Sequence, residues 1–154
     1  MRARLESLLF VLVLLGCTKS NPQLVPIDGQ VTMDGAPLAD HVVTFTPVGD
    51  TKGSGALGST DDNGRFSLTD VRGQAGAHVG QYKVSLYPMG STGASADDPA
   101  SVVAMGHVGL PPVYIDPNRT PLRAVVPRSG GSVEVLLTAT GQGASTKTTP
   151  ASNE

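Results

Sequence analysis

The only cysteine of this 154-residue chain, Cys17, is the first residue whose type and position suggest chemistry. A single cysteine cannot form a disulfide within the chain. Cys17 follows an apolar run from Leu8 to Leu15, and it lies far along the sequence from any cluster of histidines or carboxylates that could activate its thiol. We therefore expect neither a catalytic nor a core role for this residue.

The segment before Cys17 has the layout of a secretory signal, with Arg2 and Arg4 ahead of the apolar run. The run is too short to cross a bilayer, which requires about 20 apolar residues. Its end, Leu14-Leu15-Gly16-Cys17, resembles the lipobox of bacterial lipoproteins. That resemblance implies cleavage before Cys17, a diacylglyceryl group on its thiol and acylation of the new amino terminus. The alternative is an ordinary secretion signal with an incidental cysteine.

The residues around the lipobox predict where the protein resides. Residues 1–16 are the expected signal peptide, and residues 17–23 are short, polar and interrupted by a proline, as a tether should be. In the lipoprotein family, an aspartate directly after the cysteine favours retention in the inner membrane, whereas this chain has Thr18 there. The resemblance thus implies a lipid-anchored protein of the bacterial cell envelope. We expect it in the outer membrane, on the periplasmic or surface face, with the membrane as its first partner.

Histidines and carboxylates are the other candidates for chemistry, and their spacing argues against a metal site. His41, His78 and His107 are separated by no interval typical of zinc ligands. Asp61 and Asn63 stand at the first two ligand spacings of a calcium loop, but the glycine comes too early and no glutamate follows at the required distance. A tight turn is the better interpretation of "DDNG". We expect no metal and no cofactor.

Seven segments have the alternation or the composition of β-strands. The clearest is "GQYKVSLYP", in which Tyr82, Val84 and Leu86 face one side of a strand. The other six are "IDGQVTM", "HVVTFTP", "LGST" and "RFSLT" as the two arms of a hairpin, "PLRAVVP" and "GSVEVLLT". Short strands separated by glycine, proline and asparagine turns predict an all-β fold for residues 24–138, a seven-stranded antiparallel β-sandwich.

Two regions fall outside this rhythm of strands and turns. We expect residues 88–121 to form one long loop, and long loops in compact domains are usually functional or mobile. Tyr87, His107 and Tyr114, in or beside this loop, are the predicted candidate binding surface. Residues 139–154 are rich in glycine, serine and threonine and predict a disordered tail.

Charge and composition narrow the class of partner. Removal of the signal peptide takes two of the 11 basic and one of the 13 acidic side chains, which leaves a net charge near −3. The domain has no strongly basic stretch and no alternation of basic with aromatic residues, so nucleic acid is a poor candidate partner. Tryptophan is absent from the chain, which weakens a role in stacking on carbohydrate.

Four blocks, in their order along the chain, carry a family resemblance: "VPIDGQVTMDGAPLADHVVTFTP", "GSTDDNGRFSL", "GAHVGQYKVSLYP" and "LPPVYIDPNRTPLRAVV". They resemble the small transthyretin-like, carboxypeptidase-regulatory-like lipoproteins that are abundant in planctomycete-type bacteria. The resemblance implies a prealbumin-like seven-stranded sandwich in a secreted or envelope protein, and it implies no activity. Tyr82 fits a corner tyrosine in such a fold, with its ring in the core and its hydroxyl bonded to backbone.

The function expected from these observations is a non-catalytic binding or structural module that serves an unknown envelope protein or glycan. The last strand lacks the Tyr-Arg-Gly-Ser motif of hydroxyisourate hydrolases, and the chain has no His-x-His element like that of intradiol dioxygenases. A glycan-binding accessory lipoprotein is one alternative, and it requires Tyr87 and Tyr114 to be exposed on one face. A small periplasmic hydrolase is the other. It requires two of the three histidines, or one of them with an aspartate, to converge, the aspartates considered being Asp97, Asp98 and Asp116.

Overall fold

The computed structural model describes residues 23–89 and 109–152, and within them the fold is all-β with one short helix. The expected signal peptide, nearly all of the expected tether with Cys17, and residues 90–108 of the expected long loop, which include His107, lie outside the described residues. Strands occupy each of the seven segments expected to form them. No helix within the described residues is long and apolar enough to cross a membrane.

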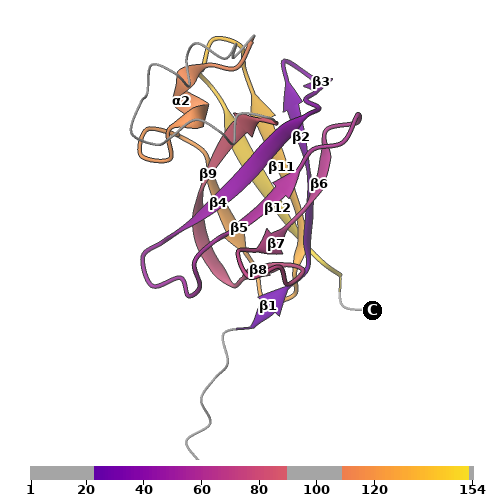
Figure 1. Cartoon of the computed structure of the whole chain (residues 1–154), viewed down its shortest axis with the longest axis vertical. Coiled ribbons are helices and arrows are strands. Elements are labelled where there is room, and N and C mark those ends of the chain that lie inside the picture. Colours follow the sequence, from indigo (N-terminus) through magenta and orange to yellow (C-terminus); the bar gives the residue numbers. More distant parts are fainter. Residues whose placement is uncertain (1–22, 90–108, 153–154) are drawn as a thin grey trace, which may run out of the picture.

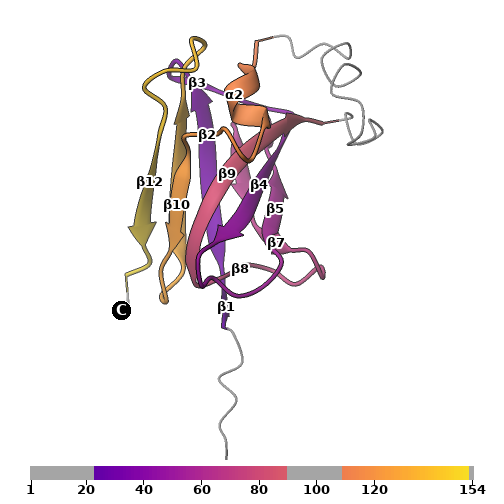
Figure 2. The same cartoon turned by 90° about the vertical axis from the view of Figure 1, so that its left-hand side faces the viewer.

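Two five-stranded sheets form the two layers seen edge-on in Figure 2. The first sheet has, in order, β10 (Arg123–Val126), β9 (Gly80–Pro88), β4 (His41–Val48), β5 (Ala56–Ser59) and β7 (Thr69–Asp70). The second has β12 (Ser145–Pro150), β11 (Gly131–Leu137), β2 (Ile27–Met33) and β3 (Ala36–Pro37), with β6 (Arg65–Ser67) paired to β2. A small third sheet pairs β1 (Leu24–Val25) with β8 (Ala77–His78).

The core fills the space between the two sheets. Its side chains come from alternate strand positions, as the period-two patterns predicted, because successive residues of a strand point to opposite faces. They are almost fully buried, and they include Ile27, Val31, Val43, Phe45, Tyr82, Val84, Leu86, Val133 and Val135. Aromatic rings meet at the centre, where the ring centroids of Phe45 and Tyr82 are 5.7 Å apart.

Tyr82 confirms the prediction of a corner tyrosine. Its side chain is 1 % exposed, and its hydroxyl donates a hydrogen bond of 2.7 Å to the carbonyl oxygen of His78. Burial raises the pKa of Tyr82 to about 12, an effect that the hydrogen bond to His78 partly offsets. The core side chain thus holds the backbone of β8, which forms the edge of the candidate site described below.

The expectation of a wholly antiparallel fold is wrong for one pair of strands. β2 and β11 run parallel, from Ile27 beside Gly131 to Met33 beside Leu137. A parallel pair cannot be closed by a tight turn and needs a long connection. Here the connection is nearly the whole domain, so local sequence signals could not show the direction of pairing.

The expected hairpin between residues 57 and 69 is also only partly correct. β6 leaves β5 and pairs with β2 of the other sheet, while β7 returns to pair with β5. Glycine allows this crossing, because a Cβ at Gly58 would lie 2.5 Å from the carbonyl oxygen of Ser67. The strand segment 65–70 therefore joins the two sheets along one side of the domain.

The prediction of a disordered tail is wrong, since residues 145–150 form β12. Its backbone pairs with nearly the whole length of β11, from Ser145 beside Leu136 to Pro150 beside Gly131. The hydroxyl of Thr146 donates to the carbonyl oxygen of Arg123, on the edge strand of the first sheet. The segment has few apolar side chains to bury, but backbone hydrogen bonds to the open edge of β11 hold it in place.

The domain has two distinct ends along its long axis (Figure 1). At one end lie Gln23, β1, β8 and the turns at residues 49–55, 71–76 and 127–130, and we call this the β1 end. At the other end lie α2 (Pro112–Ile115), the end of β9 and the turns at residues 34–35 and 60–64, and we call this the α2 end.

Candidate functional site

The predicted binding surface does not exist as a set of three exposed side chains. Tyr87 lies on the outer face of β9 beside Val42 and is half-buried. Tyr114 is 0 % exposed. His107 lies outside the described residues.

Tyr114 was wrongly placed on a surface because it follows a stretch without strand signals. Residues 109–121 are instead an ordered return into the core, with α2 carrying the tyrosine inward and Leu110 buried near it. The Tyr114 hydroxyl lies 3.1 Å from the carbonyl oxygen of Thr138, to which it donates, and accepts from the Thr138 amide at 3.2 Å. The ring therefore closes the α2 end of the core and cannot stack on a ligand. A glycan platform made of Tyr87 and Tyr114 is excluded by this burial.

His41 and the "DDNG" sequence have structural partners of their own. Nδ1 of His41 lies 2.6 Å from the carbonyl oxygen of Ala39 at the α2 end, while His78 is in β8 at the β1 end. Asp61 confirms the tight turn, because its carboxylate accepts hydrogen bonds of 2.8 Å from the amides of Asn63 and Arg65. Among residues 23–89 and 109–152, no three His, Cys, Asp or Glu side chains gather as metal ligands would.

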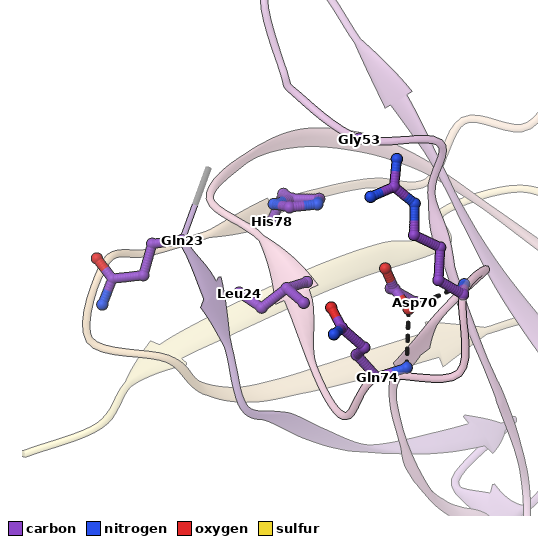
Figure 3. Close-up of a pocket in the computed structure, with 7 residues that line it drawn as sticks. Gln23, Leu24, Gly53, Asp70, Gln74 and His78 are labelled. Atoms are coloured by element: carbon purple, nitrogen blue, oxygen red, sulfur yellow. Dashed lines mark hydrogen bonds between the residues drawn. The ribbon is translucent and has the colours of Figure 1, made fainter. Parts of the chain in front are cut away.

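Hollows in the described surface offer a different candidate site, and the larger of the two discussed here lies at the β1 end (Figure 3). It has a volume of about 550 Å³ and is lined by Gln23, Leu24, Gly53, Asp70, Arg72, Gln74 and His78. The residues come from β1 and the position before it, from β7 and β8, from the turn that joins β4 to β5, and from the turn that joins β7 to β8. Sequence analysis missed this site, since its residues are spread over more than fifty positions and form no motif.

Asp70 builds one wall of this hollow. The carboxylate is 6 % exposed, and its Oδ1 accepts hydrogen bonds from the amides of Arg72 at 2.9 Å and Gln74 at 2.8 Å (Figure 3). The Asp70 amide in turn donates to the carbonyl oxygen of Gln74 at 2.8 Å. An aspartate that bonds to amides two and four residues ahead fixes a turn. The turn at residues 71–76 is therefore rigid where it carries the Arg72 and Gln74 side chains.

His78 forms the opposite wall and packs against the turn at residues 49–55. Gly53 has a φ of +87°, and a Cβ there would lie only 2.1 Å from Cδ2 of the His78 ring. Only glycine fits such a position, because it tolerates positive φ and leaves room for the imidazole. Thr51 fastens the same turn to β9, since its hydroxyl accepts from the Gln81 amide at 2.8 Å and donates to the Gln81 carbonyl at 3.1 Å.

The polar groups of the hollow suit a small anionic or strongly polar group. Nδ1 of His78 is buried and has no hydrogen-bond partner within the described part of the chain. Arg72 supplies a guanidinium, and Gln23 and Gln74 supply amides that both donate and accept. These side chains can hold such a group through hydrogen bonds and through the charge of Arg72. Since the Asp70 Oδ1 is already used by backbone amides, the arrangement supports recognition better than acid–base chemistry.

A second hollow, of about 460 Å³, lies between β2, β5 and β6 and is lined by Asp28, Gly29, Ser59, Asp61, Arg65, Phe66 and Ser67. Three of its polar side chains already have partners within the protein, since the Ser67 hydroxyl donates to Asp28 Oδ1 at 2.5 Å and Asp61 caps its own turn. Gly29 allows the Phe66 ring to lie against β2, because a Cβ there would come within 2.3 Å of the ring. This hollow is best explained as a result of strand packing.

Comparison of the chain with protein-family models, with curated proteins and with solved structures finds no match.

Proposed function

We propose that this protein is a lipid-anchored protein of the cell envelope, and that its β-domain is a non-catalytic module for binding or for structure. The observation that carries the proposal is the position of Cys17. It is the chain's only cysteine, and it follows a short apolar run that begins after two arginines. Its membrane would be the outer membrane, because Thr18 replaces the aspartate that favours inner-membrane retention in the lipoprotein family.

The anchor has a simple physical basis. Each buried methylene contributes about 0.8 kcal/mol, so one chain binds reversibly and two or more hold a protein to a bilayer stably. Three acyl chains on Cys17 would keep the domain at the membrane. The described chain begins at Gln23, six residues after Cys17, and six extended residues span at most about 21 Å. The domain would thus be held close to the lipid surface.

The proposed fold family is the prealbumin-like seven-stranded sandwich that the sequence resemblance implies. Two facing sheets and the corner tyrosine Tyr82 support it. The additional strand β12 and the parallel pair β2–β11 are departures from a simple antiparallel sandwich. Fold membership of this kind implies no activity by itself.

The role as a non-catalytic module is supported by how the polar side chains are used. His41, Asp61 and Asp70, which could serve in acid–base chemistry, each bond to nearby backbone and stabilise a turn or a strand end. His41 and His78 lie at opposite ends of the domain, so these two histidines cannot converge on one substrate. The hollow at the β1 end, with Arg72 and His78, is the part of the described surface best suited to recognition.

A Cys17→Ala variant tests the anchor in cells that carry bacterial lipoprotein-processing enzymes. We expect the wild-type chain to incorporate labelled palmitate and to enter the detergent phase on phase separation, and the variant to do neither. A Ser20→Ala variant in the same segment is the matched control and should behave as wild type. A Cys17→Ala protein that still partitions with detergent and membranes would refute the lipoprotein assignment.

Crosslinking in the native envelope tests the role of the domain. Pull-down of the acylated protein followed by mass spectrometry should recover one dominant envelope partner or a glycan. Replacement of Arg72 by Ala should weaken that recovery if the hollow at the β1 end is the recognition site, while Arg119→Ala at the α2 end should leave it unchanged. Turnover of ester or amide substrates by the purified domain would contradict a non-catalytic module.

A further inference from the structure

The exposed charges of the domain are separated between its two ends. At the β1 end, Lys52, Arg72 and Arg128 are exposed, each on a different turn. The carboxylates at this end are the exposed Asp50 and the buried Asp70, so the cations outnumber them by one. The α2 end has an excess of negative charge. It carries five exposed or half-buried carboxylates but only two exposed guanidinium groups. These residues are Asp34, Asp40, Asp61, Asp62 and Asp116, with Arg65 and Arg119. A chain with a net charge of −2 therefore has one net basic end.

The basic end is also the end at which the described chain begins. Gln23 and β1 lie beside the three turns that carry these cations, and both views of the domain place them together (Figures 1 and 2). The Gly131 amide donates to the carbonyl oxygen of Pro26 at 3.2 Å, which ties the turn of Arg128 to the start of the domain. The segment that leads to Cys17 must therefore leave from the basic end.

We propose that the β1 end is a membrane-docking face, formed by Lys52, Arg72 and Arg128, that rests on an anionic phospholipid surface. The inference rests on the proposed lipid anchor, and it adds an orientation and a lipid preference to it. Two observations on the described residues carry it: the exit point of the chain and the charge of the face around it. A tether of at most about 21 Å keeps these cations within reach of the headgroups, and an anionic surface attracts basic groups placed next to it.

The hollow at the β1 end lies within this face and gives it a specific contact. Arg72 lines it, and a lipid phosphate is an acceptor that its guanidinium can bind. The Asp70 carboxylate lines the same hollow, and its Oδ1 accepts from the backbone amides of Arg72 and Gln74. Val71, directly before Arg72, is 52 % exposed at the start of the same turn. An apolar side chain beside a cation suits the boundary between headgroups and acyl chains. The opposite end, with its aspartates, would point away from the membrane.

The test uses the mature chain from Cys17 onward, coupled through its only thiol to a maleimide lipid in vesicles. Because the chain has no tryptophan, one introduced tryptophan is a unique energy donor to a dansyl-labelled lipid headgroup. Ser54→Trp places the donor at the β1 end, and Asn118→Trp places it at the α2 end, both at exposed positions. The vesicles are phosphatidylcholine alone or mixed with phosphatidylglycerol.

Energy transfer from the Ser54→Trp reporter should rise when phosphatidylglycerol is added, and transfer from the Asn118→Trp reporter should not. Each cation removed should lower the ratio of docked to undocked protein about five-fold at low salt. The combined change Lys52→Glu, Arg72→Glu and Arg128→Glu should therefore abolish the rise. The matched control combines Arg65→Glu, Arg119→Glu and Lys147→Glu. It changes the net charge by the same amount at exposed positions away from the β1 end, and it should keep the rise in energy transfer.

Equal energy transfer from Ser54→Trp on neutral and anionic vesicles would overturn the proposal of a docking face. Loss of the rise in the control variant, to the same extent as in the β1-end variant, would also overturn it. These outcomes are separate from failure of the lipid anchor itself. The thiol coupling is chemical and does not depend on acylation in cells, whereas the Cys17→Ala experiment reports on acylation alone. Circular dichroism of each variant, compared with wild type, shows that a loss of transfer arises from docking rather than from unfolding.

Discussion

Replacement of Tyr82 by Phe tests how far one hydroxyl holds the corner beneath the candidate site. The Tyr82 ring is 1 % exposed and packs against Phe45, and the hydroxyl donates to the carbonyl oxygen of His78 at 2.7 Å. The substitution keeps the ring and removes the hydroxyl only. It therefore leaves core volume almost unchanged, and the energetic effect isolates the hydrogen bond between the core and β8.

The expected loss can be worked from this geometry. A neutral hydrogen bond contributes about 1 kcal/mol net to stability, and a buried carbonyl left without its donor costs about 1–3 kcal/mol. No cavity cost adds to this, because the aromatic ring remains. We expect Tyr82→Phe to lower the free energy of unfolding by about 1–3 kcal/mol.

Urea unfolding followed by far-ultraviolet circular dichroism measures this loss, since the chain has no tryptophan for fluorescence. The denaturation midpoint should fall while the m-value stays constant, because the same surface is exposed on unfolding. Tyr87→Phe, on the outer face of β9, is the matched control and should change stability by less than about 0.5 kcal/mol. An equal effect of the two substitutions would refute the assignment of the corner bond.

The same residue predicts a dependence on alkaline pH. Burial raises the pKa of Tyr82 from 10.0 to about 12 in the folded protein, so the native state holds the phenol proton more tightly than the unfolded chain does. This contribution to stability is complete below pH 10 and is lost as the pH rises through about 12. Wild type and Tyr82→Phe should therefore converge in stability between these pH values. A constant difference across that range would contradict a buried, protonated phenol.

Two further substitutions and one truncation test other parts of the structure. Gly53→Ala should destabilise the domain by about 2 kcal/mol more than Gly73→Ala. Both glycines have positive φ, but only a Cβ at residue 53 would clash with the His78 ring. The urea denaturation midpoints of the two variants measure the difference. Tyr114→Phe should cost about 1 kcal/mol and raise hydrogen exchange at Thr138, and unchanged exchange there would show that the hydroxyl does not hold the α2 end. Truncation before residue 145 removes β12, and should lower stability on the order of 2 kcal/mol and promote association through the open edge of β11. An unchanged midpoint and light-scattering profile would contradict the role of β12.

The candidate site was less predictable than the fold. Sequence reasoning named Tyr87, His107 and Tyr114 because they lie in or beside a stretch without strand rhythm. Tyr114 is buried because a single turn of helix directs it inward, and four residues of helix are too few to show a periodic pattern. The hollow at the β1 end depends on a capped turn, a glycine with positive φ and a histidine that meet only when β1 pairs with β8. No spacing in the sequence signals that meeting.

The sequence by itself determined the local structure of this protein. Alternating side chains located β2, β4, β9 and β11, and the Asn-Gly pair located the turn at residues 61–64, because successive residues carry that information within a few positions. Tertiary structure alone decided the rest: the parallel partner of β2, the crossing of β6 and β7 between sheets, the strand formed by the polar tail, and the basic end at which the described part of the chain begins. Each of these depends on backbone edges and charges brought together from segments distant in the sequence, and a local pattern carries no information about which distant edge will be free to pair.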